Sequence, residues 1–286
     1  MLWNDGKFNQ LRIGNEQIIN STYMFTPNFA DPIPEVSTVK DLGIYIDNDM
    51  SFKSHINTII SKTNNKCSWI LRTFYNRELS TLRMLWKSLA QPHLDYGALL
   101  WYPTGNHSLM EGLEGPLGLF TRNIKGCKQM NYWQRLDFTG INSVERRIER
   151  FKNIYTWKVI NGLAPSLDFI LKNDDRRGKT IVLNKPTGSV MRIVSLKEKS
   201  LQYQGPNLFN ALPKCIREIE GNLTHFKTVL DLFLTLLPDC PILKGYTTHT
   251  YDKYDKQSNS ILDWIKKKKL YDWELPLDSA VNSDAG

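Results

Sequence analysis

The stretch NSVERRIERFKNIYTWKVINGLAP, residues 142–165, indicates the fold class of the chain most directly. Apolar side chains recur in it at spacings of three and four residues, which predicts an amphipathic helix. They are Val144, Ile148, Phe151, Tyr155 and Val159. Asn142 and Glu145 have the spacing of a capping box at the helix start. Gly162 and Pro165 are typical of a helix end.

Similar patterns on both sides of this stretch predict a mainly helical chain. Residues 51–74 repeat apolar side chains at the same spacings, and Ser51 is a favourable N-cap. A second helix is predicted to begin at Ser80 and to end at Pro92, because proline breaks the helical hydrogen-bond pattern. Further helices are predicted over 108–124, from Asn131 and from a cap at Thr224.

The N-terminal residues are predicted to form a small β element. Leu42, Ile44 and Ile46 alternate with more polar residues in VKDLGIYID, as in a half-buried strand. Gly43 within this stretch indicates a bend or a close backbone approach. The predicted fold is therefore mainly α with a small N-terminal β element. Its parts are this element over 1–50, a helical bundle over 51–171, a basic extended segment followed by a helix over 172–238, and a poorly ordered tail over 239–286.

The charge of the chain favours an anionic partner. Of its 286 residues, 37 are Lys or Arg and 29 are Asp or Glu, which gives a formal net charge of +8 and a pI of about 9.2. We rank nucleic acid first among the partners and an acidic membrane surface second. No run of about 18 apolar residues and no apolar signal region is visible. We therefore expect a soluble intracellular protein, in the nucleus or the cytoplasm, with no membrane as a partner.

Much of the positive charge lies in residues 172–199. This segment has eight basic and three acidic residues and thus a net charge of +5. We predict that it contacts phosphates, together with three arginines that fall largely off the apolar stripe of 142–165. The candidate residues are Arg176, Arg177, Lys179, Lys185, Arg192, Lys197 and Lys199, and on the helix Arg146, Arg147 and Arg150. The alternatives are a solvated surface hairpin and a helix face that is charged only for solubility.

The cysteines and histidines do not have the spacing of a metal site or of a catalytic site. The four cysteines and the five histidines lack the spacing of a zinc site or of a nucleophile and its base, so no metal site and no catalytic residue is predicted. Most tryptophans lie on or beside apolar stripes, which favours core packing over base stacking. They are Trp69, Trp86, Trp101, Trp133 and Trp157. The run Lys266–Lys269 is either a nuclear import signal or part of a solvated tail.

Six segments, taken in order, resemble one family. They are VKDLGIYIDNDMSFKSHI (39–56), WILRTF (69–74), MLWKSLAQPHLDYGALLW (84–101), NYWQRL (131–136), RRIERFKNIYTWKVINGLAP (146–165) and GPNLFNALPKCIR (205–217). Together they resemble the part of jockey-type non-LTR retrotransposon reverse transcriptases that follows the catalytic centre. The resemblance covers about residues 10–237.

This resemblance implies a role in holding nucleic acid. Residues 39–50 would end the palm as the primer-grip strand pair, with Lys40, Leu42 and Gly43 as primer-grip-like residues. The helices from residue 51 onward would form the thumb, which holds a template–primer duplex by its backbone. The implied partners are RNA, DNA or an RNA–DNA hybrid. Mg²⁺ is implied for the full-length polymerase, and no cofactor for this fragment.

The matched stretch lacks the carboxylates of the polymerase reaction. Nucleotidyl transfer needs two divalent metals held by closely placed carboxylates. The family carries them upstream, in a strand-borne aspartate and an aromatic-Ala-Asp-Asp turn. Phe29-Ala30-Asp31 imitates that turn, but Pro32 stands in place of the second aspartate. We therefore predict a truncated RNA-directed DNA polymerase fragment without the catalytic palm and inactive alone.

The sequence leaves two alternative interpretations open, and it departs from the family pattern in one stretch. The chain could be a helical protein-interaction or structural module that binds no nucleic acid, or a palm could lie upstream in the gene. The departure is at 108–124, where the family has a regular helix. Three glycines cost about 1 kcal/mol each in a helix interior, and Pro116 costs about 3 kcal/mol. We expect either a loop there or a decaying copy.

Overall fold

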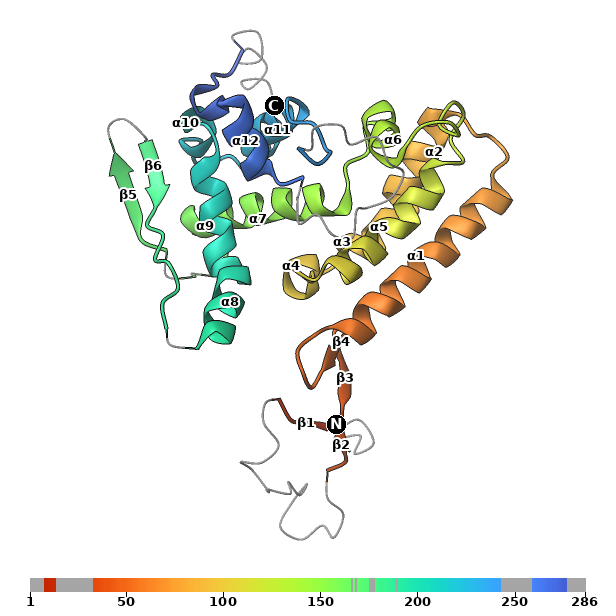
Figure 1. Cartoon of the computed structure of the whole chain (residues 1–286), viewed down its shortest axis with the longest axis horizontal. Helices are drawn as coiled ribbons and strands as arrows, with labels where there is room; N and C mark the ends of the chain where they lie inside the picture. The colour runs from red at the N-terminus through yellow and green to blue at the C-terminus, as the bar shows by residue number, and fades with distance from the viewer. Residues whose placement is uncertain are drawn as a thin grey trace. The chain divides into compact units, whose positions relative to one another are not determined.

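The computed structural model describes residues 8–13, 33–165, 167, 169–174, 178–188, 190–242 and 259–276. Over these residues the chain is mainly helical with three two-stranded sheets (Figure 1), which confirms the predicted fold class. It divides into two compact units. The first comprises Met1–Tyr75 and Leu85–Pro116, and the second Asn76–Met84 and Leu117–Gly286.

In the first unit a β-hairpin leads into the longest helix (Figure 1). Strand β3 (Thr38–Asp41) pairs antiparallel with β4 (Ile44–Asp47). Leu42 and Gly43 form the turn with φ angles of 45° and 87°, as a type I′ turn requires. The prediction of one strand with Leu42 on its buried face is wrong, because Leu42 is a turn residue. A shorter parallel pair, β1 (Gln10–Leu11) and β2 (Glu35–Val36), lies in the same unit.

Helix α1 (Lys53–Thr73) buries the predicted apolar stripe, including Ile56, Ile59 and Ile70. Its start differs from the prediction, because Phe52 and not Ser51 occupies the N-cap position. The Asp47 carboxylate accepts a hydrogen bond from the Ser54 amide at 3.1 Å. It thereby satisfies one of the free N–H groups of the first turn. Burial opposes the charge of Asp47, but hydrogen bonds from Ser54 and Thr38 lower its pKa below the usual value.

The next helical segment passes through a π-helical turn. Helix α2 (Leu79–Leu85) continues as η3 (Trp86–Ala90) and then α3 (Gln91–Asp95). Pro92 was predicted to end this helix, yet it lies in the first turn of α3. A proline ring clashes with the carbonyl four residues before it, and a wider turn relieves that clash. The short helix α4 (Ala98–Trp101) follows.

The glycine-rich stretch forms helix α5 (His107–Thr121), with Pro116 inside it. The helix predicted over 108–124 is therefore confirmed, and the alternative of a loop is wrong. Leu113, Leu117 and Phe120 on this helix are fully buried. Burying such a side chain contributes about 1.5–3 kcal/mol, so three of them offset the low helix propensity of this stretch.

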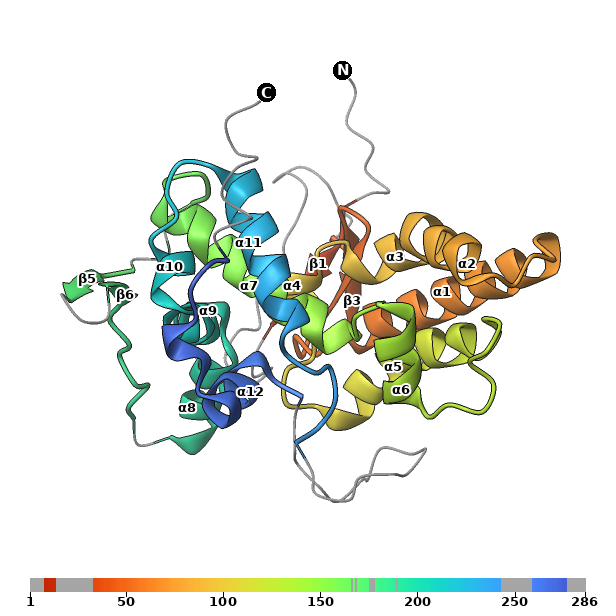
Figure 2. The ribbon, with the colours of Figure 1, turned by 90° about the horizontal axis from the view of Figure 1, so that it is seen from above.

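The second unit is built around α7 (Val144–Ile160). Its N-cap is Ser143 rather than Asn142, because the Ser143 hydroxyl accepts the Arg146 amide at 3.1 Å. Helix α11 (Leu223–Thr235) lies against α7 (Figure 2). There Trp157 stacks on Phe226, with ring centroids 5.0 Å apart. The cap of α11 is Asn222 and not the predicted Thr224.

The second unit contains further helices and a β-hairpin. Helix α6 (Tyr132–Thr139) begins, as predicted, at Asn131 with a capping box. The other elements are β5 (Leu171–Asp174), β6 (Gly178–Ile181), α8 (Met191–Lys199), α9 (Leu201–Ala211) and α10 (Lys214–Arg217). The β5–β6 hairpin is joined to α9 by the Asn210 side chain, which bonds both the amide and the carbonyl of Ile181.

The prediction of a poorly ordered tail is wrong for residues 259–276. They form α12 (Ile261–Lys268) and the single turn η4 (Leu270–Asp272). Ile261 and Ile265 are fully buried in the core of the second unit. The lysine run that was considered an import signal forms the end of α12. The remainder of the predicted tail beyond Ile242 lies outside the described residues.

Candidate nucleic-acid interface

The arginines of α7 do not form an exposed basic face. Arg146 is 1% exposed and Arg147 is 5% exposed. Arg150 binds Asp231 of α11 through two hydrogen bonds, one of them 2.7 Å long. The prediction that Arg146 and Arg147 contact phosphates is therefore wrong, because tertiary packing places both in the interior.

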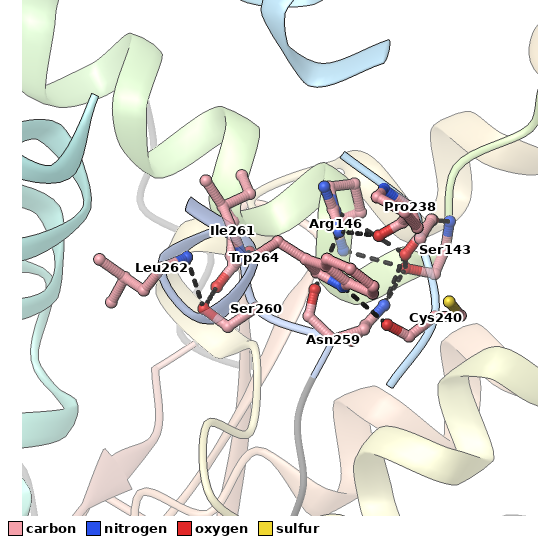
Figure 3. Close-up of polar contacts among 11 residues, drawn as sticks. Ser143, Arg146, Pro238, Cys240, Asn259, Ser260, Ile261, Leu262 and Trp264 are labelled. Carbon is pink, nitrogen blue, oxygen red and sulfur yellow. Dashed lines mark hydrogen bonds and ion pairs between the residues drawn. The ribbon is translucent and has the colours of Figure 1, made fainter. Parts of the chain in front are cut away.

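Arg146 instead takes part in a buried polar network (Figure 3). Its guanidinium donates to the carbonyls of Pro238 and Asn259, at 2.8 and 2.9 Å. The Asp239 carboxylate accepts the amide and the hydroxyl of Ser143, at 2.6 and 2.9 Å. The Asn259 side chain donates to Asp239 at 2.5 Å and to Ser143 at 3.1 Å. These bonds tie the start of α7 to two later segments.

A second part of the network holds the start of α12. The Glu149 carboxylate accepts the Ser260 hydroxyl at 2.5 Å and the Ile261 amide at 2.7 Å. Glu149 is buried, and burial raises its pKa, although the charge of Arg146 acts in the opposite direction. We refer to the residues of both parts as the C-terminal clasp. They are Ser143, Arg146, Glu149, Asp239, Asn259 and Ser260.

The predicted basic segment is partly exposed and partly neutralised. Lys185, Lys197 and Lys199 are exposed, the latter two in the last turn of α8. Lys179 forms an ion pair with Glu220. Arg192 lies in α8. The remaining two candidates, Arg176 and Arg177, lie outside the described residues.

A second basic surface, which was not predicted from the sequence, lies on α1. Residues 50–77 contain five basic residues and no Asp or Glu, so their net charge is also +5. The solvent-facing positions of α1 carry only basic, Ser, Asn, Thr and Trp side chains. A helix face that is charged for solubility usually mixes both signs, so a face without carboxylates favours an anionic partner. The absence of acidic residues between Asp49 and Glu78 was the available signal.

Three residues of α1 lie on one stripe, because they are four and three positions apart. We refer to Lys62, Lys66 and Trp69 as the cationic stripe. The Lys66 ammonium lies 5.0 Å from the centroid of the Trp69 ring. Burial lowers the pKa of His93 on α3, and the charges of Lys66 and Lys62 lower it further. His93 therefore lies near this stripe. The stripe thus presents positive charge beside an aromatic ring.

The primer-grip-like residues lie at the tip of the β3–β4 hairpin. Leu42 is 82% exposed, and Lys40 is also exposed, with its ammonium 5.5 Å from the centroid of the Tyr45 ring. The Tyr96 hydroxyl donates to the Leu42 carbonyl at 2.8 Å. A positive φ at leucine costs about 1–2 kcal/mol, so Tyr96 stabilises a turn that leucine alone disfavours. Tyr96 was not singled out from the sequence.

The hairpin is fixed to the helices of the first unit by close packing. The Tyr45 amide donates to Nδ1 of His55 on α1 at 3.3 Å, and the His55 ring meets the edge of Trp101 with centroids 5.3 Å apart. Gly97 has a φ of 63°, and a Cβ at this position would lie 2.8 Å from Ile44 Cδ1. The first unit therefore holds the hairpin tip and the cationic stripe in a defined relation.

A comparison with known proteins finds a partial similarity to a nematode protein. The chain is 30% identical over 112 residues to the uncharacterized protein B0403.1 of Caenorhabditis elegans. The match covers 38% of this chain and 56% of that protein, so the chain spans about half the length of its relative. No family model and no solved structure matches the chain.

Two further observations limit the chemistry of the described residues. Within the described ranges no helix combines the length and the apolar character needed to cross a bilayer. Across the same residues no three His, Cys, Asp or Glu side chains gather as a metal site would require. The candidate site is thus defined by exposed positive charge and by the hairpin tip.

Proposed function

We propose that this chain is the post-catalytic part of a jockey-type non-LTR retrotransposon reverse transcriptase and acts inside the cell. In this proposal its first unit contacts the backbone of an RNA–DNA template–primer duplex. The observation that carries the proposal is α1, a 21-residue helix without one carboxylate and with four basic side chains. The order of the six matched segments supports the assignment to the family.

The chemistry of α1 suits contacts with phosphates. Lysine ammonium groups and the neutral donors of Ser and Asn can bind phosphate oxygens of any nucleotide, and such contacts carry no sequence information. The proposed binding is therefore independent of sequence. It depends on salt, because each neutralised phosphate releases counterions and contributes about −0.9 to the slope of log affinity against log salt.

Catalysis in this proposal belongs to the palm of the polymerase. The family's metal-binding carboxylates precede the stretch that is matched here, and Mg²⁺ would be held there. The described residues would grip the duplex, with Lys40, Leu42 and Gly43 at the primer and α1 along the backbone.

Fluorescence anisotropy with a short RNA–DNA hybrid at several salt concentrations tests the proposal. We expect a slope of roughly −3 to −4, as for about four phosphate contacts. The variant Lys62→Ala/Lys66→Ala should flatten the slope by about one to two units. Its matched control is Lys128→Ala/Lys266→Ala, which removes the same charge from exposed positions outside α1 and should leave the slope nearly unchanged.

The predicted basic segment is tested in the same assay. Arg176→Ala/Arg177→Ala/Lys179→Ala should flatten the slope by about two to three units if this segment also binds, and Lys197→Ala/Lys199→Ala by about one to two. No binding at low salt would contradict the proposal and favour the helical protein-interaction module. Equal slopes in the α1 variant and its control would remove α1 from the interface.

A further inference from the structure

Trp69 is unusual among the tryptophans of the chain. In the described part of the sequence it is the one exposed tryptophan, with a relative exposure of 44%. Trp86, Trp101 and Trp157 are almost fully buried. Leaving so large an apolar ring in water forgoes its burial energy. Trp69 was predicted to pack in the core, and its exposure corrects this prediction.

The indole of Trp69 is oriented by its neighbours on the same segment. The ring of Phe74 meets it nearly perpendicularly, at 82° and with centroids 6.1 Å apart. The Lys66 ammonium lies over it, 5.0 Å from the centroid. These contacts restrict the rotamers of Trp69 while much of the ring stays accessible.

We propose that Trp69 is a stacking platform for an unpaired nucleobase, so that the cationic stripe prefers a duplex that carries a single-stranded extension. This inference rests on the proposed function and specifies the ligand of the same surface. Its basis is the combination of an exposed, oriented indole with two lysines on one helical stripe. Cations along a backbone and an aromatic ring beneath a base are the two elements by which proteins bind single strands without sequence preference.

The roles within the stripe differ. In a blunt duplex the bases are paired and stacked on one another, and only the outer faces of the two terminal pairs are open to the indole. Where the strand becomes unpaired, a base can leave the stack and lie on Trp69, while Lys62 and Lys66 contact the adjoining phosphates. The lysines thus contribute to binding of both ligands, and Trp69 contributes to binding of the extended one.

The test compares two probes on the full chain, a blunt RNA–DNA hybrid and the same hybrid with an unpaired extension. The wild type should bind the extended probe more tightly, and Trp69→Ala should weaken this binding by roughly fivefold to tenfold, with little effect on the blunt probe. Trp69→Phe should keep most of the preference, because it keeps an aromatic face. Lys62→Ala should weaken the binding of both probes by a similar factor.

A direct readout is 2-aminopurine at the first unpaired position, whose fluorescence should be quenched by the wild type and not by Trp69→Ala. The stacking role is overturned if the wild type binds both probes with equal affinity. It is also overturned if Trp69→Ala weakens the binding of both probes by the same factor. Either result leaves the proposed function standing. Absence of binding to either probe at low salt overturns both. Urea unfolding of Trp69→Ala shows whether its fold is intact. If it is not, the preference of the wild type for the extended probe and its quenching of 2-aminopurine carry the test.

Discussion

The hydroxyl of Tyr96 donates a 2.8 Å hydrogen bond to the carbonyl of Leu42, 54 positions earlier in the chain. The bond lies at the surface, where hydrogen bonds contribute little beyond those to water. Tyr96→Phe should therefore lower the free energy of unfolding by about 0.5–1 kcal/mol and speed amide exchange in β3 and β4. Tyr75→Phe is a matched control, because Tyr75 is largely exposed. If the amides of β3 and β4 exchange at the same rate in both variants, the turn does not depend on the Tyr96 hydroxyl.

A change at Leu42 should have the opposite sign. Asparagine tolerates a positive φ better than leucine and is favoured before glycine in type I′ turns. Leu42→Asn should therefore raise the free energy of unfolding by about 0.5–1 kcal/mol in urea titrations. If Leu42 contacts the primer, the same variant should bind the hybrid more weakly. Leu42→Ala, which keeps the unfavourable φ, should not be more stable than the wild type.

The pH dependence of stability should report His55. Burial, and then the charge of Lys62, lower its pKa, while Asp47 acts in the opposite direction. The unfolded chain thus binds this proton more readily than the folded protein. The stability is complete above the unfolded pKa of about 6.5 and is lost as the pH falls from there through the folded pKa.

Urea titrations across this range test the effect. His55→Asn should reduce the loss of stability below pH 6.5. His93 contributes in the same direction, because burial and the charges of Lys66 and Lys62 lower its pKa as well. The double variant His55→Asn/His93→Asn should flatten the dependence of stability on pH further. An unchanged profile in both variants would place the titrating groups elsewhere.

The C-terminal clasp should contribute strongly to stability. Glu149→Ala leaves the Ser260 hydroxyl and the Ile261 amide without their acceptor in a buried place. Each unsatisfied group costs about 1–3 kcal/mol, so we expect a loss of roughly 2–5 kcal/mol in urea unfolding. The control Glu198→Ala, at an exposed position of α8, should stay within about 0.5 kcal/mol of the wild type.

Hydrogen exchange should distinguish α5 from α7. The amides of α5 should exchange faster, because Pro116 interrupts its hydrogen bonds and three glycines oppose the helix. Protection equal to that of α7 would show that the burial of Leu113, Leu117 and Phe120 fully compensates for the sequence.

Local patterns predicted the long helices and failed where distant contacts decide. The stripes at 51–74 and 142–165 predicted α1 and α7, because each repeats an apolar face over many turns. Helix α12 has only eight residues, and half of them are charged. It gains its stability from burial of Ile261 and Ile265 in a core formed by other segments, and a local pattern does not reveal that core.

The helix ends and the site were predicted less well, for different reasons. Asn142 and Ser143 are both good caps, and only the Ser143 hydroxyl meets the amide of Arg146. The burial of Arg146 depends on a carbonyl 113 positions away. The charge of α1, by contrast, was available in the sequence, since no acidic residue lies between Asp49 and Glu78.

The C-terminal clasp also has a consequence for the synthesis of the chain. Glu149 leaves the ribosome 111 positions ahead of its partner Ser260. At about 5–20 residues per second, translation of this interval takes roughly 5 to 20 seconds. Throughout this time the surface that α12 will cover is exposed, and the Glu149 carboxylate lacks its hydrogen bonds from Ser260 and Ile261. The folding yield of the second unit should therefore depend on translation speed and on chaperones that shield this surface from other nascent chains.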